Sequence, residues 1–271
     1  MRFQFGGHVE GGTGNWSGEE QHQFMKPEIR VFADASAVAR AAASEFIRLL
    51  EIAVTEHGYC TVALAGGSTP RSLYSLLADD DSLSHKLPWD KLQFFWGDER
   101  HVPPDHKDSN YRMAFESMLS KVPVLTGNIH RIGSEESDAQ KAADAYERDL
   151  RSFFELEPGR LPRFDLVLLG MGPDGHTASL FPGTTALLET ERLVAATWVE
   201  KLNTHRITLT LPTLNSAANV IFLVCGAEKA DVLHTVLQDE AGTAQYPAQL
   251  IQPIDGRLLW LLDEAAARSL R

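Results

Sequence analysis

The chain has 271 residues, of which 44% are hydrophobic and 23% charged, and these proportions are typical of a folded domain rather than a disordered chain. Its formal net charge is −12 and it has no basic stripe, which argues against nucleic acid as a partner. No apolar run reaches the roughly 18 residues that span a bilayer, and the N-terminus lacks the pattern of a signal peptide. We therefore expect a cytoplasmic protein that does not bind membranes.

The N-terminal segment differs from the rest of the chain. Residues 1–26 combine closely spaced glycines with polar residues and show neither a helical nor a strand period. This composition predicts a flexible N-terminal extension. No linker-like stretch interrupts the remainder, so we predict one folded domain over residues 27–271.

Short apolar runs alternate with amphipathic segments from residue 29 onward. We predict strands over residues 29–32, 61–65, 92–96, 165–169, 207–211, 220–224 and 258–262. We predict helices over residues 35–56, from residue 70 onward, and over 110–119, 139–154 and 227–237. This alternation predicts an α/β fold with a Rossmann-like, mostly parallel sheet and helices on both faces. Ligands of such sheets bind outside the carboxyl ends of the strands.

Glycines and hydroxyl residues join the second predicted strand to the next helix. Gly66 and Gly67 let the backbone approach a ligand, and Ser68 and Thr69 add hydroxyl donors at the start of the helix. The free amides and the dipole of a helix N-terminus favour an anion. The spacing matches neither a Walker loop nor a dinucleotide fingerprint. An ordinary capped turn is an equally good interpretation of this segment alone.

A second group of polar residues follows the aromatic strand at 92–96. Asp98, Glu99 and Arg100 come directly after it, and the guanidinium of Arg100 could hold a phosphate through two hydrogen bonds. Taken alone, this motif is more typical of a solvated charge run at a strand end.

The strongest motif follows the strand at 165–169. Gly170, Gly172 and Gly175 shape a loop that carries Asp174 and His176 two residues apart. A histidine beside a carboxylate is the usual apparatus for activating water, so we predict His176 as a general base with Asp174 as its partner.

Two cations precede the predicted strand at 207–211. Lys201 and Arg206 could neutralise a phosphate or bind sugar hydroxyls, although a solvated loop is the simpler explanation of these residues alone.

Several segments together resemble the 6-phosphogluconolactonases, within the superfamily of glucosamine and galactosamine 6-phosphate isomerases. The matching segments are LAGGSTP at 64–70, FFWGDERHVP at 94–103, SNYRMAFESML at 109–119, FDLVLLGMGPDGHTASLFPGT at 164–184 and RITLTLPTLNSAANVIFLVCGAEKADVL at 206–233. The resemblance implies a Rossmann-like sheet and hydrolysis of 6-phospho-D-glucono-1,5-lactone to 6-phosphogluconate, in the oxidative pentose phosphate pathway. It implies no cofactor and no metal, and a monomer or weak homo-oligomer is expected.

The resemblance also implies roles for individual residues. His176 corresponds to the proposed base of the family. The residues expected to hold the phosphosugar lactone are Gly66, Gly67, Ser68, Thr69, Asp98, Arg100, Gly172, Lys201 and Arg206. The family commonly has prolines after the lysine, where this chain has Leu202 and Asn203, so the assignment of Lys201 is less direct.

Two alternative functions remain open at this point. Hexosamine-phosphate deaminases share the fold and the Asp-Gly-His loop, but they typically carry Asp-Glu-Tyr where this chain has Asp98, Glu99 and Arg100. They also carry an acidic residue five positions after the histidine, where this chain has Phe181. A non-enzymatic phosphosugar sensor is the second alternative.

Overall fold

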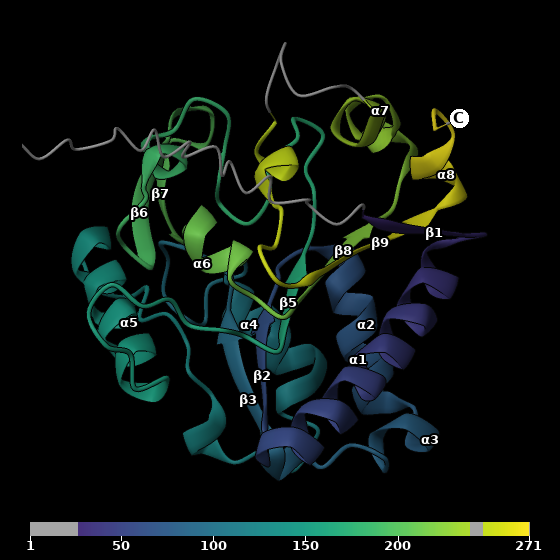
Figure 1. Cartoon of the computed structure of the whole chain (residues 1–271), viewed down its shortest axis with the longest axis horizontal. Coiled ribbons are helices and arrows are strands. Elements are labelled where there is room, and N and C mark those ends of the chain that lie inside the picture. Colours follow the sequence, from purple (N-terminus) through teal and green to yellow (C-terminus); the bar gives the residue numbers. More distant parts are fainter. Residues whose placement is uncertain (1–26, 239–245, 271) are drawn as a thin grey trace, which may run out of the picture.

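A six-stranded parallel sheet forms the centre of the computed structural model, which describes residues 27–238 and 246–270 (Figure 1). Its strands, in spatial order, are β1 (Glu28–Phe32), β9 (Arg257–Asp263), β8 (Asn219–Val224), β5 (Leu166–Leu169), β2 (Cys60–Leu64) and β3 (Leu92–Trp96). All neighbouring strands in it run parallel. The predicted mostly parallel α/β fold is confirmed, and the predicted extension over 1–26 lies outside the described residues.

A second, smaller sheet is antiparallel, with the order β4 (Asp98–Arg100), β7 (Thr204–Leu209) and β6 (Val194–Val199). The prediction of a further strand of the parallel sheet over residues 207–211 is therefore wrong. The strand pairs with β4 and β6 in the antiparallel sheet, and it ends at Leu209. The chain leaves the strand before Leu211 because Pro212 in the first turn favours a new helix, α6 (Leu211–Asn215). Sequence analysis also missed β6, whose alanines give little strand signal.

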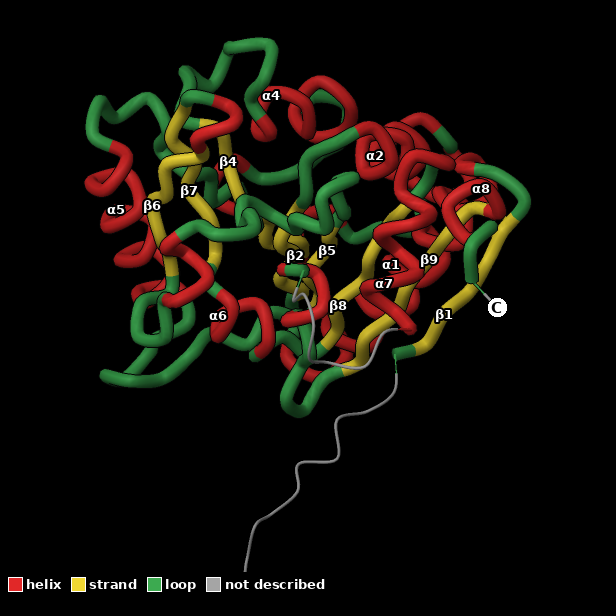
Figure 2. Tube along the Cα trace, turned by 90° about the horizontal axis from the view of Figure 1, so that it is seen from above, coloured by secondary structure: helices red, strands yellow, loops and turns green. Residues whose placement is uncertain are grey.

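Helices flank the sheets (Figures 1 and 2). Besides α6 they are α1 (Ala35–His57), α2 (Ser68–Asp79), α3 (Asp81–Ser84), α4 (Asn110–Ala114), α5 (Ala139–Phe153), α7 (Ala230–Gln238) and α8 (Glu264–Ala267). The longest, α1, begins where the carboxylate of Asp34 accepts a hydrogen bond from the Ala37 amide, and it ends at Gly58, whose φ of 87° suits glycine. It packs against α2 and β9, while α5 packs against β6 and β7.

The central strands are apolar because both faces of the sheet are covered. All residues of β2, β5 and the second half of β9 are buried. Between β8 and β9, the rings of Phe222 and Trp260 stack with centroids 3.8 Å apart. None of the described helices is long and apolar enough to cross a membrane.

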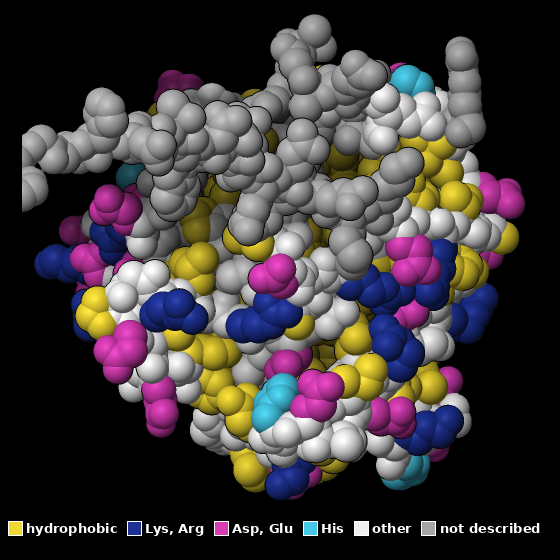
Figure 3. Space-filling model, viewed as in Figure 1, with side chains coloured by type: hydrophobic (Ala, Val, Ile, Leu, Met, Phe, Trp, Pro, Cys, Tyr) yellow, Lys and Arg dark blue, Asp and Glu magenta, His cyan; other side chains and the backbone are white. Residues whose placement is uncertain are grey.

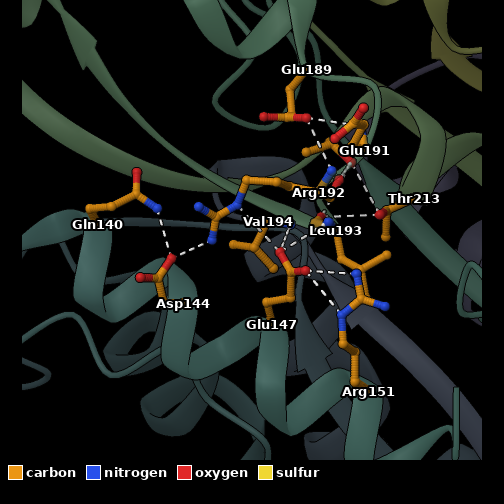
Figure 4. A network of polar contacts seen from close by, with 11 residues as sticks. Gln140, Asp144, Glu147, Arg151, Glu189, Glu191, Arg192, Leu193, Val194 and Thr213 are labelled. Carbon is orange, nitrogen blue, oxygen red and sulfur yellow. Dashed lines mark hydrogen bonds and ion pairs between the residues drawn. The ribbon is translucent and has the colours of Figure 1, made fainter. Parts of the chain in front are cut away.

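Ion-pair networks tie the outer elements to this core. Arg192 lies between Asp144 and Glu147 of α5, and Glu147 also accepts the backbone amide of Leu193 just before β6 (Figure 4). On another side, basic and acidic side chains gather over β1 and α1 (Figure 3). There the buried Glu45 carboxylate accepts hydrogen bonds from Arg257 and Arg48, which hold its pKa at about 2 although burial raises it.

Candidate active site

The loops that follow β2, β3 and β5 surround one cavity of about 260 Å³. Because neighbouring parallel strands end at the same edge of the sheet, segments a hundred residues apart in sequence meet there. The predicted site residues that line this cavity are Gly66, Gly67, Ser68, Thr69, Asp98, Arg100, Gly172 and His176. Asp174, Lys201 and Arg206 are not on its wall, and their positions are described below.

The loop between β2 and α2 presents the start of a twelve-residue helix to the cavity. Gly67 has a φ of 105°, which a residue with a side chain rarely adopts. At Gly66 a Cβ atom would lie 2.0 Å from the Oδ1 atom of Asn110, so only glycine allows this approach. The chain can thus bring Ser68, Thr69 and the first amides of α2 to the cavity edge, where they suit an anion.

The charged residues after β3 have different positions and partners. Glu99 is almost fully buried and accepts the backbone amides of Arg100, Asn110 and Tyr111, so it fixes β4 to α4. Burial raises the pKa of Glu99, and these hydrogen bonds oppose that rise. Asp98 accepts the Ser179 hydroxyl at 2.6 Å. This hydrogen bond joins the segment after β3 to the histidine loop.

The histidine loop is held by its own backbone. The Gly172 amide donates to the His176 carbonyl at 2.9 Å, and the Gly175 amide donates to the Gly172 carbonyl at 3.0 Å. A Cβ atom on Gly172 would lie 2.1 Å from the His176 ring. The glycine therefore permits the imidazole to fold back over the loop.

The His176 side chain contacts Asp174 and is 27% exposed. Its Nδ1 atom bonds to one carboxylate oxygen of Asp174, and the Nζ atom of Lys201 bonds to the other. A proton on Nδ1 that is donated to Asp174 leaves the lone pair of Nε2 free to accept a proton.

The surroundings of His176 favour the neutral imidazole. Burial lowers its pKa to about 4, and although Asp98 opposes this, the positive charges of Arg206, Arg100 and Lys229 lower it further. Near neutral pH the imidazole is therefore uncharged, as a general base must be.

Three cations gather around the cavity without ion-pair partners among the described residues. Arg100 on β4 and Arg206 on β7 are register partners, and the Nε atom of each is buried without a hydrogen bond among those residues. Burial and the nearby Arg100 lower the pKa of Arg206. Two like charges held this close to a pocket suit an anionic ligand.

Sequence analysis missed Lys229, the third of these cations. It lines the cavity from a short 3₁₀ turn, Ala227–Lys229, that follows β8. The signal that could have found it is the one used for the other residues, namely a polar side chain just beyond the carboxyl end of a buried strand. Asn110, which also lines the cavity, donates to the Asp98 carbonyl at 2.9 Å and supports the same wall.

The chain is similar in sequence to known proteins. Residues 33–260 match the family model described as glucosamine-6-phosphate isomerases/6-phosphogluconolactonase. The chain belongs to this family. It is 44% identical to a 6-phosphogluconolactonase of Nostoc over 91% of this chain and 99% of the relative. It is 43% identical to a 6-phosphogluconolactonase of Synechocystis over 91% of this chain and 100% of the relative.

A solved structure agrees with these relatives. The chain resembles the 6-phosphogluconolactonase from Trypanosoma brucei with a TM-score of 0.82 and 34% identity, over 92% of this chain and 100% of that one. The predicted family is thereby confirmed, and the names of the relatives support a lactone hydrolase rather than a sensor.

The sequence-based distinction from hexosamine-phosphate deaminases rests in part on the residue five positions after the histidine. Here that residue is Phe181, which is buried and stacks on the His176 ring with centroids 4.1 Å apart. The acidic residue expected of a deaminase is thus replaced by an aromatic ring in contact with His176.

Proposed function

We propose that this chain hydrolyses 6-phospho-D-glucono-1,5-lactone to 6-phosphogluconate, with His176 as the general base. The observation that carries the proposal is a neutral imidazole at the edge of a cavity whose other walls bear unpaired cations. The imidazole suits a reaction that begins with proton removal from water, and the cations suit a phosphorylated substrate. The relatives are named 6-phosphogluconolactonases, and hydrolysis of a phosphorylated lactone needs both a base that activates water and a site for the phosphate.

In the proposed mechanism, the Nε2 atom of His176 takes a proton from a water molecule as the water oxygen attacks the lactone carbonyl carbon. A tetrahedral intermediate forms, and it collapses when the bond from this carbon to the ring oxygen breaks. The imidazolium returns its proton to the departing oxygen, which becomes a hydroxyl group, and a carboxylic acid remains and ionises. Asp174 holds the ring and its tautomer throughout.

We assign the phosphate to the positive side of the cavity. Arg100, Arg206 and Lys229 supply charge, and the start of α2 at Gly67 and Ser68 supplies amides. Asp98, Gly66 and Gly172 shape the walls rather than carry charge to the substrate. Lys201 is left out of this set because its ammonium group bonds to Asp174.

The decisive experiment is an assay of lactone hydrolysis with 6-phosphogluconolactone generated in the cuvette and product coupled to a 6-phosphogluconate dehydrogenase. Because the lactone also opens spontaneously, only the rate above an enzyme-free blank counts. The His176→Ala variant should lose about 10²–10⁴-fold in turnover and keep most of its substrate affinity. His85→Ala, which changes an exposed histidine at the end of α3, should retain full activity.

Two outcomes would contradict the proposal. No rate above the blank would exclude the lactonase, and ammonia release from glucosamine 6-phosphate would then favour a deaminase. Full turnover in His176→Ala would exclude this histidine as the base even if the wild-type protein hydrolyses the lactone.

We also retain the cytoplasm as the expected compartment. The two cysteines, Cys60 and Cys225, are free thiols in the structure, as suits a reducing environment. A monomer or weak homo-oligomer remains our prediction for the assembly, and size-exclusion chromatography with light scattering would test it.

A further inference from the structure

Lys201 and Phe181 contact the Asp174–His176 pair, and neither lines the cavity that holds the predicted substrate residues. The Phe181 ring is 5% exposed and meets the His176 ring at an interplanar angle of 23°. The Lys201 Nζ atom lies 4.6 Å from the centroid of the same ring. Both residues, with Asp174, line a separate cavity of about 540 Å³ rather than the one that holds the predicted substrate residues.

We propose that Lys201 and Phe181 are positioning residues, which hold Asp174 and His176 in the geometry that the base needs. The inference rests on the proposed lactone hydrolysis and changes the role of Lys201 from phosphate binding to support of the base. Lys201 acts through the second oxygen of Asp174, and Phe181 acts through the face of the imidazole. Neither residue touches the substrate.

The need for Lys201 follows from the charge of Asp174. A carboxylate that contacts only an imidazole favours the imidazolium, which cannot take a proton from water. An ammonium group on the other carboxylate oxygen offsets this charge while the hydrogen bond to Nδ1 still fixes the tautomer. Asp174 can thus orient the base without keeping it protonated.

The need for Phe181 follows from its shape. A flat apolar ring stacked on the imidazole excludes water from one face and restricts rotation of the side chain. The same ring offers its π-face to the Lys201 ammonium, which keeps the lysine beside Asp174. A branched aliphatic residue would fill the space but provide neither contact.

Other charged groups also face His176 and are still present when Lys201 or Phe181 is changed. They come from β4, β7, the turn after β8 and the histidine loop itself, and they are Asp98, Arg100, Arg206, Lys229 and Asp174. Changes in the titration of His176 in the variants therefore report on the loss of the substituted side chain, including its effect through Asp174.

The test compares Lys201→Met with Lys201→Arg, and Phe181→Leu with Phe181→Tyr. The pKa of His176 would be measured in the ligand-free protein by NMR titration, with His176→Asn to assign the signal, and kcat and KM would be measured separately. In Lys201→Met we expect the pKa of His176 to rise by about 1 unit. We expect kcat to fall about tenfold while KM changes less than about twofold, because an interaction with the base rather than the substrate is lost.

The conservative variants should reverse these effects. Lys201→Arg keeps a cation beside Asp174 and should restore most of kcat. Phe181→Tyr keeps the stacked ring and should do the same, whereas Phe181→Leu should lower kcat about tenfold with KM nearly unchanged. A thermal melt of each variant would confirm that it is folded before its kinetics are compared.

Two results would overturn the inference. If Lys201→Met raised KM more than about tenfold with kcat and the His176 titration unmoved, Lys201 would bind the phosphate instead. If Phe181→Leu behaved like the wild type, the ring would merely fill space. Failure of the proposed function itself would be distinguishable, since the wild-type protein would then show no lactone hydrolysis while the NMR titration still reported on these contacts.

Discussion

Two charged regions of the molecule differ in whether their arginines form ion pairs. In the network of Figure 4, Arg151 donates twice to Glu147, and Arg192 reaches Asp144 and Glu147. At the cavity edge, Arg206 has no ion pair among the described residues. Among the described residues, the Arg100 guanidinium donates to the Asp108 carbonyl at 2.6 Å and has no ion pair. Paired charges hold two elements together, whereas unpaired charges beside a cavity remain available to a ligand.

The two regions also differ in what fixes their geometry. The network is held by side chains that bridge α5 and the segment before β6, so glycine plays no part in it. The cavity depends on backbone that approaches side chains closely, at Gly66 against Asn110 and at Gly172 against His176. Charge density alone therefore does not distinguish the two regions, whereas unpaired cations beside glycine-built loops do.

The largest effect on turnover should come from adding a side chain to one of these glycines. In Gly172→Ala, the new Cβ would lie 2.1 Å from the His176 ring, so the ring must move by roughly 1 Å. We expect turnover to fall about 100-fold, because a misplacement of this size can cost that much. Steady-state kinetics would measure it. Gly127→Ala is the matched control, since a Cβ there meets nothing within 4 Å, and equal losses in both variants would contradict the argument.

Removal of an unpaired cation should have the next largest effect. We expect Arg100→Met to raise KM for the phosphorylated lactone by roughly 10- to 100-fold, because a hydrogen bond to a charged group contributes about 1.5–3 kcal/mol. Turnover should change less, since the phosphate is remote from the reacting carbon. The control is Arg151→Met, which removes a paired cation of the network and should leave KM unchanged. An unaltered KM in Arg100→Met would exclude this arginine from phosphate binding.

The sequence predicted the parallel sheet and the three loops at its edge well, because these rest on local patterns. Buried strands such as β2 and β5 are almost entirely apolar, and each is followed directly by a loop that lines the cavity. The antiparallel sheet was not predicted, since β4 has only three residues and its partner β7 is more than a hundred residues away.

The assignment of roles within the site was harder than its location. Sequence analysis grouped Asp98, Glu99 and Arg100, yet Glu99 points inward to cap α4 while Arg100 faces the cavity. Likewise Lys201 and Arg206 lie five residues apart, but only Arg206 pairs across from Arg100. Side-chain direction depends on strand register and on tertiary neighbours, and neither follows from spacing alone.

The smallest expected effect is on the free energy of unfolding at acidic pH, where two histidines with lowered pKa values can be compared. Burial lowers the pKa of both His176 at the cavity and His130, which stacks on Phe95 in the core. The unfolded chain binds a proton at His176 below about pH 6.5, and the folded chain does so only near pH 4. Its contribution therefore lowers the free energy of unfolding as the pH falls through this window, by roughly 1 kcal/mol between pH 6 and pH 5.

Urea unfolding of the wild type and of His176→Asn at these two pH values would isolate this contribution, because His130 remains in both proteins. The variant should lose less stability on acidification than the wild type does. A parallel loss in both would mean that His176 titrates normally in the folded protein, and its neutrality near pH 7 would then owe little to the cavity. His130→Gln should likewise reduce the acid sensitivity but leave lactone hydrolysis intact, since a lowered histidine pKa reflects burial and becomes catalytic only where a cavity brings substrate to the ring.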